Sequence, residues 1–189
     1  QSFNFTASGI IPTALVPVED ETSAITICRA MIDSGSQLSL ITESAVQKMQ
    51  LKRRRQSLTV NGIGNVAKTC NSGSVFLPLK PKSGPKVIEV RAFILPSLTQ
   101  LLPSRSFDKS AQSHMRRVEL ADPDFNVSSA IDLILGADIA EEITLDGKFS
   151  ENNGLHYRNT VFGWIVSGKQ PNHTGTVANT SLCINDTFT

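Results

Sequence analysis

Short apolar runs separated by turn-forming residues restrict this chain to a fold built mainly from β-strands. Each run is rich in Val, Ile, Leu and Thr and is bounded by Gly, Pro, Asn or Ser, which is the pattern of strands in mostly-β domains. The polar segment 19–23 is interpreted as the hairpin loop between the first two runs. We predict strands over 10–18, 24–32, 57–63, 74–79 and 87–95.

Two short helices are predicted among these strands. The first covers 43–49 and has Thr42 as its N-cap. The second follows Gly136 and runs from 137 to about 143, with Asp138 and Glu141 in its early turns, where the helix dipole favours acidic side chains.

The segment 98–126 interrupts the strand pattern, because it is polar and holds few strand-like runs. We interpret it as a long excursion with one irregular helix. The residues from 169 to 189 are polar and without periodicity, which predicts a C-terminal tail or linker. The remaining segment, 1–168, has the length of one domain with its own hydrophobic core.

The composition indicates a folded protein. Apolar residues make up 40% of the 189 residues and charged residues 19%, which excludes disorder of the whole chain. The net charge of +1 gives no indication of a nucleic-acid partner, and no apolar run reaches the roughly 20 residues of a membrane helix. The three cysteines and three histidines have no metal-ligand spacing, and the odd cysteine count argues against structural disulfides. No segment near the N-terminus has a signal-peptide pattern. We therefore expect a cytoplasmic protein with no metal, no nucleic acid and no membrane contact.

The tripeptide Asp33-Ser34-Gly35 is the candidate catalytic motif, and it directly follows the apolar run that ends at 32. A carboxylate at the end of a rigid strand has a defined position. The Ser34 hydroxyl is able to donate and accept hydrogen bonds, so it could brace the turn and a partner chain. Gly35 lacks a Cβ and allows a sharp turn and close packing. By itself this tripeptide also occurs in ordinary turns.

Aspartic peptidases need two such carboxylates. Two Asp side chains about 3 Å apart share one proton, so that one activates water while the other donates to the scissile carbonyl. The chain has one Asp-Ser-Gly and no Asp-Thr-Gly, and Asp146-Gly147 lacks the intervening hydroxyl residue. If Asp33 is catalytic, its partner must be Asp33 of a second chain, in a two-fold symmetric homodimer.

Two further features support this hypothesis. Gly62-Ile63-Gly64 lies between two strand-like runs and is typical of a mobile hairpin tip, which predicts a flap over an extended peptide; the alternative is an ordinary hairpin turn. The run 131–138 is apolar up to Gly136 and then leads into the second predicted helix. It is either a generic strand-to-helix turn or the second half of the active-site scaffold, in which Ile134 could line a substrate pocket.

The order of these features resembles the retropepsin family of aspartic proteases, and more closely the protease region of Bel–Pao type retrotransposon polyproteins. The similarity covers roughly 10–168 and rests on the segments 12–16, 28–37, 120–125, 131–138 and 162–168. It implies a closed, barrel-like β fold whose terminal strands interleave at a homodimer interface. It also implies cleavage of the element's own polyprotein by Asp33 without a cofactor, in the cytoplasm or within virus-like particles.

Two alternatives remain open. The chain could be a catalytically silent module that keeps this fold for binding or dimerisation. It could instead be a secreted, glycosylated domain, because N-x-S/T sequons occur at Asn4, Asn126, Asn172, Asn179 and Asn185; a chain rich in Asn, Ser and Thr also produces such sequons by chance. The basic run 52–55 is interpreted as a solvated turn.

Overall fold

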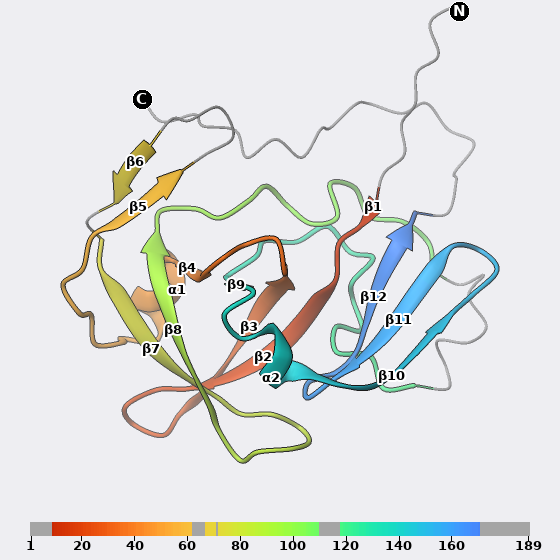
Figure 1. Ribbon diagram of the computed structural model, residues 1–189, viewed down its shortest axis with the longest axis horizontal. Helices are drawn as coiled ribbons and strands as arrows, with labels where there is room; N and C mark the ends of the chain where they lie inside the picture. The colour runs from red at the N-terminus through yellow and green to blue at the C-terminus, as the bar shows by residue number, and fades with distance from the viewer. Residues whose placement is uncertain (1–8, 62–66, 71, 110–117, 171–189) are drawn as a thin grey trace, which may run out of the picture.

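The computed structural model describes residues 9–61, 67–70, 72–109 and 118–170, and confirms a mostly-β fold with two short helices (Figure 1). The strands are β1 (Gly9–Ile10), β2 (Thr13–Glu19), β3 (Ile25–Ile32), β4 (Ser39–Thr42), β5 (Leu58–Asn61), β6 (Ala67–Cys70), β7 (Ser74–Leu79), β8 (Ile88–Leu95), β9 (Leu133–Leu135), β10 (Thr144–Ser150), β11 (Leu155–Thr160) and β12 (Gly163–Lys169). The helices are α1 (Glu43–Lys48) and α2 (Ala140–Ile143).

Six strands close into a barrel in the order β2-β3-β9-β4-β8-β7. The short strand β9 lies between β3, to which it is parallel, and β4, to which it is antiparallel. Side chains alternate between the two faces of each strand, so every second residue points into the barrel. The core includes Val16, Ala30, Ile41, Leu77 and Leu133, none of which is exposed to solvent.

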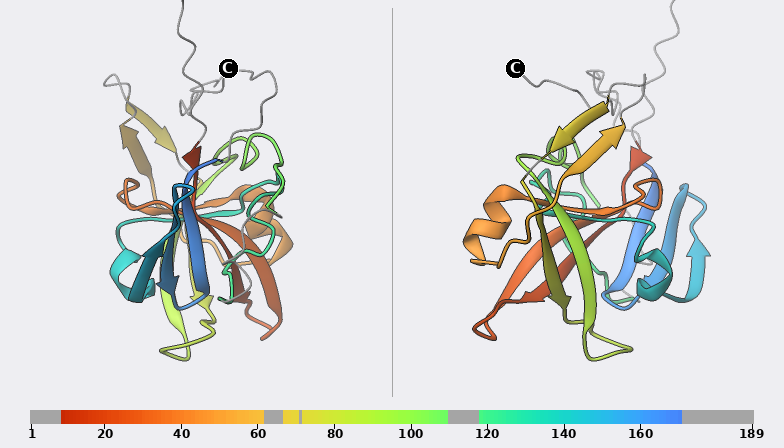
Figure 2. Two further views of the ribbon diagram at one scale, coloured as in Figure 1. Left: turned by 90° about the vertical axis from the view of Figure 1, so that its right-hand side faces the viewer. Right: turned by 60° about the vertical axis from the view of Figure 1, so that its left-hand side comes forward.

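A second, four-stranded sheet lies beside the barrel in the order β1-β12-β11-β10 (Figures 1 and 2). It has its own apolar cluster, in which the Phe149 ring stacks on Tyr157 at 4.4 Å between centroids. Ala121 joins the two sheets, because its N–H donates to Trp164 and its carbonyl accepts from the N–H of Leu15. Backbone hydrogen bonds through Ala121 therefore connect the second sheet with the barrel.

The predicted strands are confirmed with four differences. The strand expected over 10–18 is divided into β1 and β2, because Pro12 lies between them and has no N–H to donate to a sheet. The strand expected over 57–63 is present as β5, while 62 and 63 lie outside the described residues. The strands β4, β10, β11 and β12 were not among the predicted strands; β10 is polar and charged, and β11 alternates apolar and polar residues over only its first four positions. The strand β12 includes Lys169, which the sequence placed in the tail.

The first helix is confirmed: α1 begins at Glu43, and the Thr42 hydroxyl accepts a hydrogen bond from the N–H of Ala45. The second helix begins at Ala140 rather than 137, so Asp138 precedes it instead of lying in its first turn. The cause is a tertiary contact, because the Asp138 carboxylate accepts hydrogen bonds from both the N–H and the hydroxyl of Ser39.

The excursion between β8 and β9 runs along the barrel as irregular chain (green to teal in Figure 1). Its described residues, 98–109 and 118–126, contain no helix, so the irregular helix predicted there is wrong for those residues. Backbone hydrogen bonds link its two ends, between Leu102 and Ser129 and between Phe107 and Asn126. The terminal strands β1 and β12 pair with each other within a single chain, through Gly9 with Lys169 and Ile10 with Gly168.

Candidate active site

The strand β3 presents different residues to its two faces, and this alternation positions Asp33. Cys28 and Ala30 point into the barrel core, whereas Arg29 and Met31 belong to the opposite face. Asp33 follows two residues after Met31 and continues that face. The side chain of Asp33 is partly exposed, while the strand before it is largely buried.

The Asp33 turn is held by backbone hydrogen bonds at both ends. Its N–H donates to the carbonyl of Leu135 on β9 at 3.0 Å, and its carbonyl accepts from the N–H of Ser36 at 3.1 Å. The carboxylate oxygen Oδ1 accepts from the N–H of Gly35 at 2.9 Å. Within the described part of one chain, the second carboxylate oxygen and the Ser34 hydroxyl have no hydrogen-bond partner. The turn therefore leaves one carboxylate oxygen and one hydroxyl available to a substrate or a second chain.

Gly136 allows the chain after β9 to pass directly against this turn. A Cβ at Gly136 would lie 2.7 Å from the carbonyl oxygen of Leu38 and 2.8 Å from that of Ser36, closer than side-chain atoms approach backbone. Immediately afterwards, the N–H of Ala137 donates to the carbonyl of Ser36 at 2.8 Å. Position 136 therefore has room only for a glycine. The segments 33–39 and 134–138 pack directly against each other, and we call them the interlocked unit.

Hydrogen bonds between Asp138 and Ser39 also hold this unit together. The Asp138 carboxylate accepts from the hydroxyl of Ser39 at 2.8 Å and from its N–H at 3.1 Å, and the Ser39 oxygen in turn accepts from the N–H of Gly136 at 3.1 Å. Ser39 is fully buried whereas Asp138 is exposed, so only the Ser39 end of these bonds is shielded from water. Nothing in the sequence indicated this pair, because its two residues are 99 positions apart.

An apolar row crosses the barrel wall beside Asp33. The strand registers place Met31 next to Ile134, Ile134 next to Leu40, and Leu40 next to Phe93. Directly opposed residues share a face, so the four side chains follow one another across four strands. Ile134, the predicted pocket residue, is only 5% exposed and packs in a cluster with Met31, Leu102 and Ile131. A substrate pocket at Ile134 stays a prediction.

The predicted flap, Gly62-Ile63-Gly64, lies outside the described residues. The two strands that flank it, β5 and β6, pair antiparallel from Leu58 with Cys70 to Asn61 with Ala67. Figure 1 shows this pair at the end of the barrel toward which β3 and β8 run. The flanking strands therefore have the arrangement that a hairpin requires, and a flap role remains a prediction.

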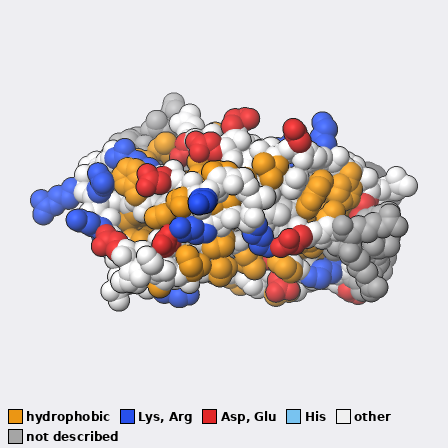
Figure 3. All heavy atoms as spheres, turned by 90° about the horizontal axis from the view of Figure 1, so that it is seen from below, with side chains coloured by type: hydrophobic (Ala, Val, Ile, Leu, Met, Phe, Trp, Pro, Cys, Tyr) orange, Lys and Arg blue, Asp and Glu red, His pale blue; other side chains and the backbone are white. Residues whose placement is uncertain are grey.

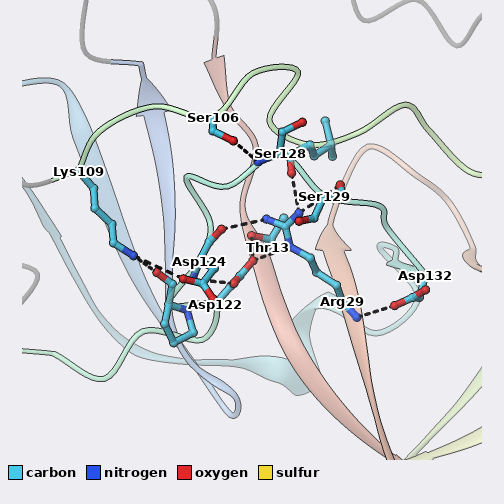
Figure 4. Close-up of polar contacts among 11 residues, drawn as sticks. Thr13, Arg29, Ser106, Lys109, Asp122, Asp124, Ser128, Ser129 and Asp132 are labelled. Carbon is cyan, nitrogen blue, oxygen red and sulfur yellow. Dashed lines mark hydrogen bonds and ion pairs between the residues drawn. The ribbon is translucent and has the colours of Figure 1, made fainter.

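A buried polar network holds the excursion against β3 (Figure 4). The Arg29 Nε donates to Asp122 Oδ2 at 2.8 Å, and the same oxygen accepts from the Thr13 hydroxyl at 2.6 Å. Nη1 of Arg29 donates to the carbonyls of Leu102 at 2.5 Å and Ser129 at 3.2 Å. Sequence reasoning missed this network; the available signal was an arginine in the middle of an apolar strand, which is costly to bury unless it is paired.

The basic run 52–55 is exposed along its length, and two of its arginines are engaged on the surface. Arg53 pairs with Glu43, and the guanidinium of Arg54 lies 4.6 Å from the ring centroid of Phe76. On the face seen in Figure 3, Lys and Arg side chains are interspersed with Asp and Glu. Arg53 and Arg54 of the run therefore make local contacts within one chain.

The sequon at Asn126 is engaged inside the excursion. Its side-chain nitrogen, the atom that would carry a glycan, donates to the carbonyl of Phe107 at 2.6 Å, and its side-chain oxygen is buried. A glycan on this nitrogen would have to displace that contact. The other four sequons lie outside the described residues.

Metal sites and membrane-spanning helices were also considered for the part of the chain that the structure describes. No cluster of three or more His, Cys, Asp or Glu side chains there is arranged to bind a metal. None of the helices in that part has both the length and the apolar character needed to cross a bilayer. Comparison of the chain with protein-family models and with curated proteins finds no match.

Proposed function

We propose that this chain is a retropepsin-like aspartic endopeptidase that works as a homodimer, with Asp33 of each chain forming the catalytic pair. The observation that carries the proposal is the Asp33 turn. Its backbone is fixed by Leu135 and Ser36, and its carboxylate keeps one oxygen free of any partner in the described part of the chain. A rigid, partly exposed carboxylate with a free oxygen is suited to activating water.

The arrangement around the turn supports a two-chain site. Ser34 and Gly35 are exposed, and the Ser34 hydroxyl is unpaired among the described residues of one chain. A second copy related by a two-fold axis would place the same turn opposite, so that the two hydroxyls and the two carboxylates face one another. In this proposal Gly35 permits the close approach of the two backbones.

The chemistry then follows that of a shared-proton carboxylate pair. The ionised Asp33 takes a proton from water, and the water oxygen bonds to the scissile carbonyl carbon. The protonated Asp33 of the partner chain donates to the carbonyl oxygen. The resulting diol collapses as the carbon–nitrogen bond breaks, a proton passes to the leaving amine, and the carboxylates return to sharing one proton. The apolar row from Met31 to Phe93 lies beside the pair, where an extended polypeptide would run.

The substrate that we propose is a polypeptide in extended conformation, foremost the polyprotein that contains this domain. An extended chain offers main-chain groups that a flap at Gly62, Ile63 and Gly64 would bind. Processing of such a polyprotein would take place in the cytoplasm or inside a virus-like particle.

A second candidate is a binding or dimerisation module without turnover. The observation that favours it is the burial of Ile134 beneath residues of the excursion, which leaves that part of the apolar row closed in a single chain. Such a module would dimerise and bind peptides but would not cleave them.

The deciding experiment is cleavage of a denatured protein mixture at about pH 5, in the range where a shared-proton pair is active. Wild type, Asp33→Asn and Asp146→Asn are compared over a range of concentrations; Asp146 is an exposed Asp followed directly by a glycine, without the intervening serine, and serves as the control. We expect cleavage that rises steeply with concentration, persists in Asp146→Asn and is lost in Asp33→Asn. A protein that sedimentation shows to be dimeric but that cleaves nothing would favour the binding module.

A further inference from the structure

The excursion covers the end of the apolar row that lies nearest to Asp33. Leu102 and Ile131 are buried together with Met31 and Ile134, and Leu98 packs against the same cluster. Leu98 and Leu102 come from the segment after β8, whereas Met31 and Ile134 belong to the barrel wall. The excursion therefore supplies part of the surface on the Asp33 side of the barrel.

Hydrogen bonds tie Leu102 to the strand that carries Asp33. Its N–H donates to the carbonyl of Ser129 at 2.9 Å, and its carbonyl accepts from the N–H of Ser129 at 3.1 Å. The same carbonyl accepts from Arg29 Nη1 at 2.5 Å. Arg29 lies four residues before Asp33 on β3 and is itself paired with the buried Asp122.

This anchoring makes Leu102 a fixed wall rather than a lid. A lid would have to break two backbone hydrogen bonds and a charge-assisted one, leaving the Arg29 guanidinium, in a residue that is 8% exposed, short of a partner. Met31 precedes Asp33 by two residues, or about 7 Å along a strand, so its side chain lies on the same face as Asp33 and within reach of a peptide held there.

On this basis we infer that Leu102 sets the size of the substrate side chain accepted next to the scissile bond. This inference rests on the proposed peptidase or peptide-binding function of the Asp33 face. The Leu102 side chain occupies space beside Met31 and Ile134, so the subsite is shallow and favours small side chains. Shortening Leu102 opens that space to a larger apolar side chain.

The test uses extended peptides that differ only in the residue before the scissile bond, which is Ala, Val, Leu or Phe. Wild type, Leu102→Ala and Leu101→Ala are compared; Leu101 is 51% exposed and lies outside the cluster, so it is the matched control. We expect kcat/KM for Leu or Phe relative to Ala to rise about 10-fold or more in Leu102→Ala, the range for one to a few methylenes in an apolar pocket. Leu101→Ala should stay within about 2-fold of wild type, as surface substitutions usually do.

A second readout separates this inference from the proposed function. Binding of the same peptides is measured by calorimetry to Asp33→Asn and to Asp33→Asn with Leu102→Ala. If Leu102→Ala changes the side-chain preference in binding while wild type cleaves none of the peptides, the inference is supported and the peptidase is overturned. Cleavage with the same preference in wild type and Leu102→Ala overturns the inference and leaves the peptidase standing. Neither cleavage nor binding by folded dimers overturns both.

Thermal unfolding of each variant accompanies these measurements, because Leu102 is buried. If Leu102→Ala does not fold, Leu102→Val replaces it, since it removes a single methylene at a smaller cost in stability. A smaller shift toward Leu is then expected, and no shift in a folded Leu102→Val protein counts against the inference.

Discussion

Arg29 and Asp122, which are 93 residues apart in the chain, form an ion pair at 2.8 Å with side chains only 10% and 1% exposed. The other ion pairs of the described residues have at least one side chain that is about a third exposed or more. A buried pair of this kind gains little over an apolar pair, but it is strongly destabilising to break, because the remaining charge has no partner. This ion pair therefore joins the excursion to β3.

Arg29→Met should lower the free energy of unfolding by about 3–5 kcal/mol, because it leaves Asp122 charged and buried without its guanidinium. Urea denaturation followed by fluorescence measures the change. The control is Lys82→Met, which breaks the exposed pair with Glu119 and should cost less than about 1 kcal/mol. A cost for Arg29→Met as small as that of the control would show that the pair does not hold the excursion.

Gly136→Ala should disrupt the turn at Asp33. The added Cβ meets backbone carbonyls of Leu38 and Ser36, which have no freedom to move without shifting the Asp33 turn. We expect a loss of about 1–3 kcal/mol in stability, as for other overpacked sites, together with loss of cleavage. Gly9→Ala is the control, because its Cβ would meet only the Gly168 oxygen at 3.9 Å. Full activity of Gly136→Ala would contradict the interlocked geometry.

Ser34→Ala should weaken the dimer while leaving the folded chain intact. The hydroxyl has no partner in the described part of one chain, so its loss removes two symmetric contacts across the proposed interface and none within the chain. Two hydrogen bonds of ordinary strength correspond to a dissociation constant raised about 10- to 100-fold. Analytical ultracentrifugation compares Ser34→Ala with Ser34→Thr, which keeps the hydroxyl, and with Ser83→Ala on an exposed loop. Equal dimer affinity in all variants would remove Ser34 from the interface.

Cys28 should react slowly with alkylating reagents in the folded protein. Burial and the neighbouring Asp132 raise the pKa of the Cys28 thiol from 9.0 to about 12, so little thiolate is present near pH 8. Mass spectrometry of the peptide that contains Cys28, with and without denaturant, measures the rate. Rapid alkylation of Cys28 under native conditions would contradict the packing of β3 against Met49.

The same raised pKa of Cys28 predicts a loss of stability in alkali. Between pH 9 and 12 the unfolded chain releases the thiol proton while the folded chain retains it, so the stability falls as the pH rises through this window. One group contributes at most about 1.4 kcal/mol per pH unit. Cys28→Ala should show a shallower alkaline decrease than wild type in urea denaturation at several pH values, and an unchanged slope would assign the loss to other groups.

Local sequence patterns were sufficient for much of the fold. Strand β3 and helix α1 were predicted from apolar runs and from the Thr42 cap, because such signals act over a few residues and the tertiary structure agrees with them. The Asp33 turn was also expected, since a polar tripeptide directly after a buried strand has few other conformations available.

Contacts between distant segments were decided only by the tertiary structure. The pairing of β9 between β3 and β4, the start of α2 after Asp138, and the pairing of Arg29 with Asp122 join residues about 90 to 105 positions apart. The sequence by itself determined the strands with clear apolar runs, such as β3, β7 and β8, and where the carboxylate lies, because apolar runs and turn residues are local properties. Only the closed barrel decided what covers that carboxylate's face, because burial and hydrogen bonding between remote segments depend on which strands become neighbours.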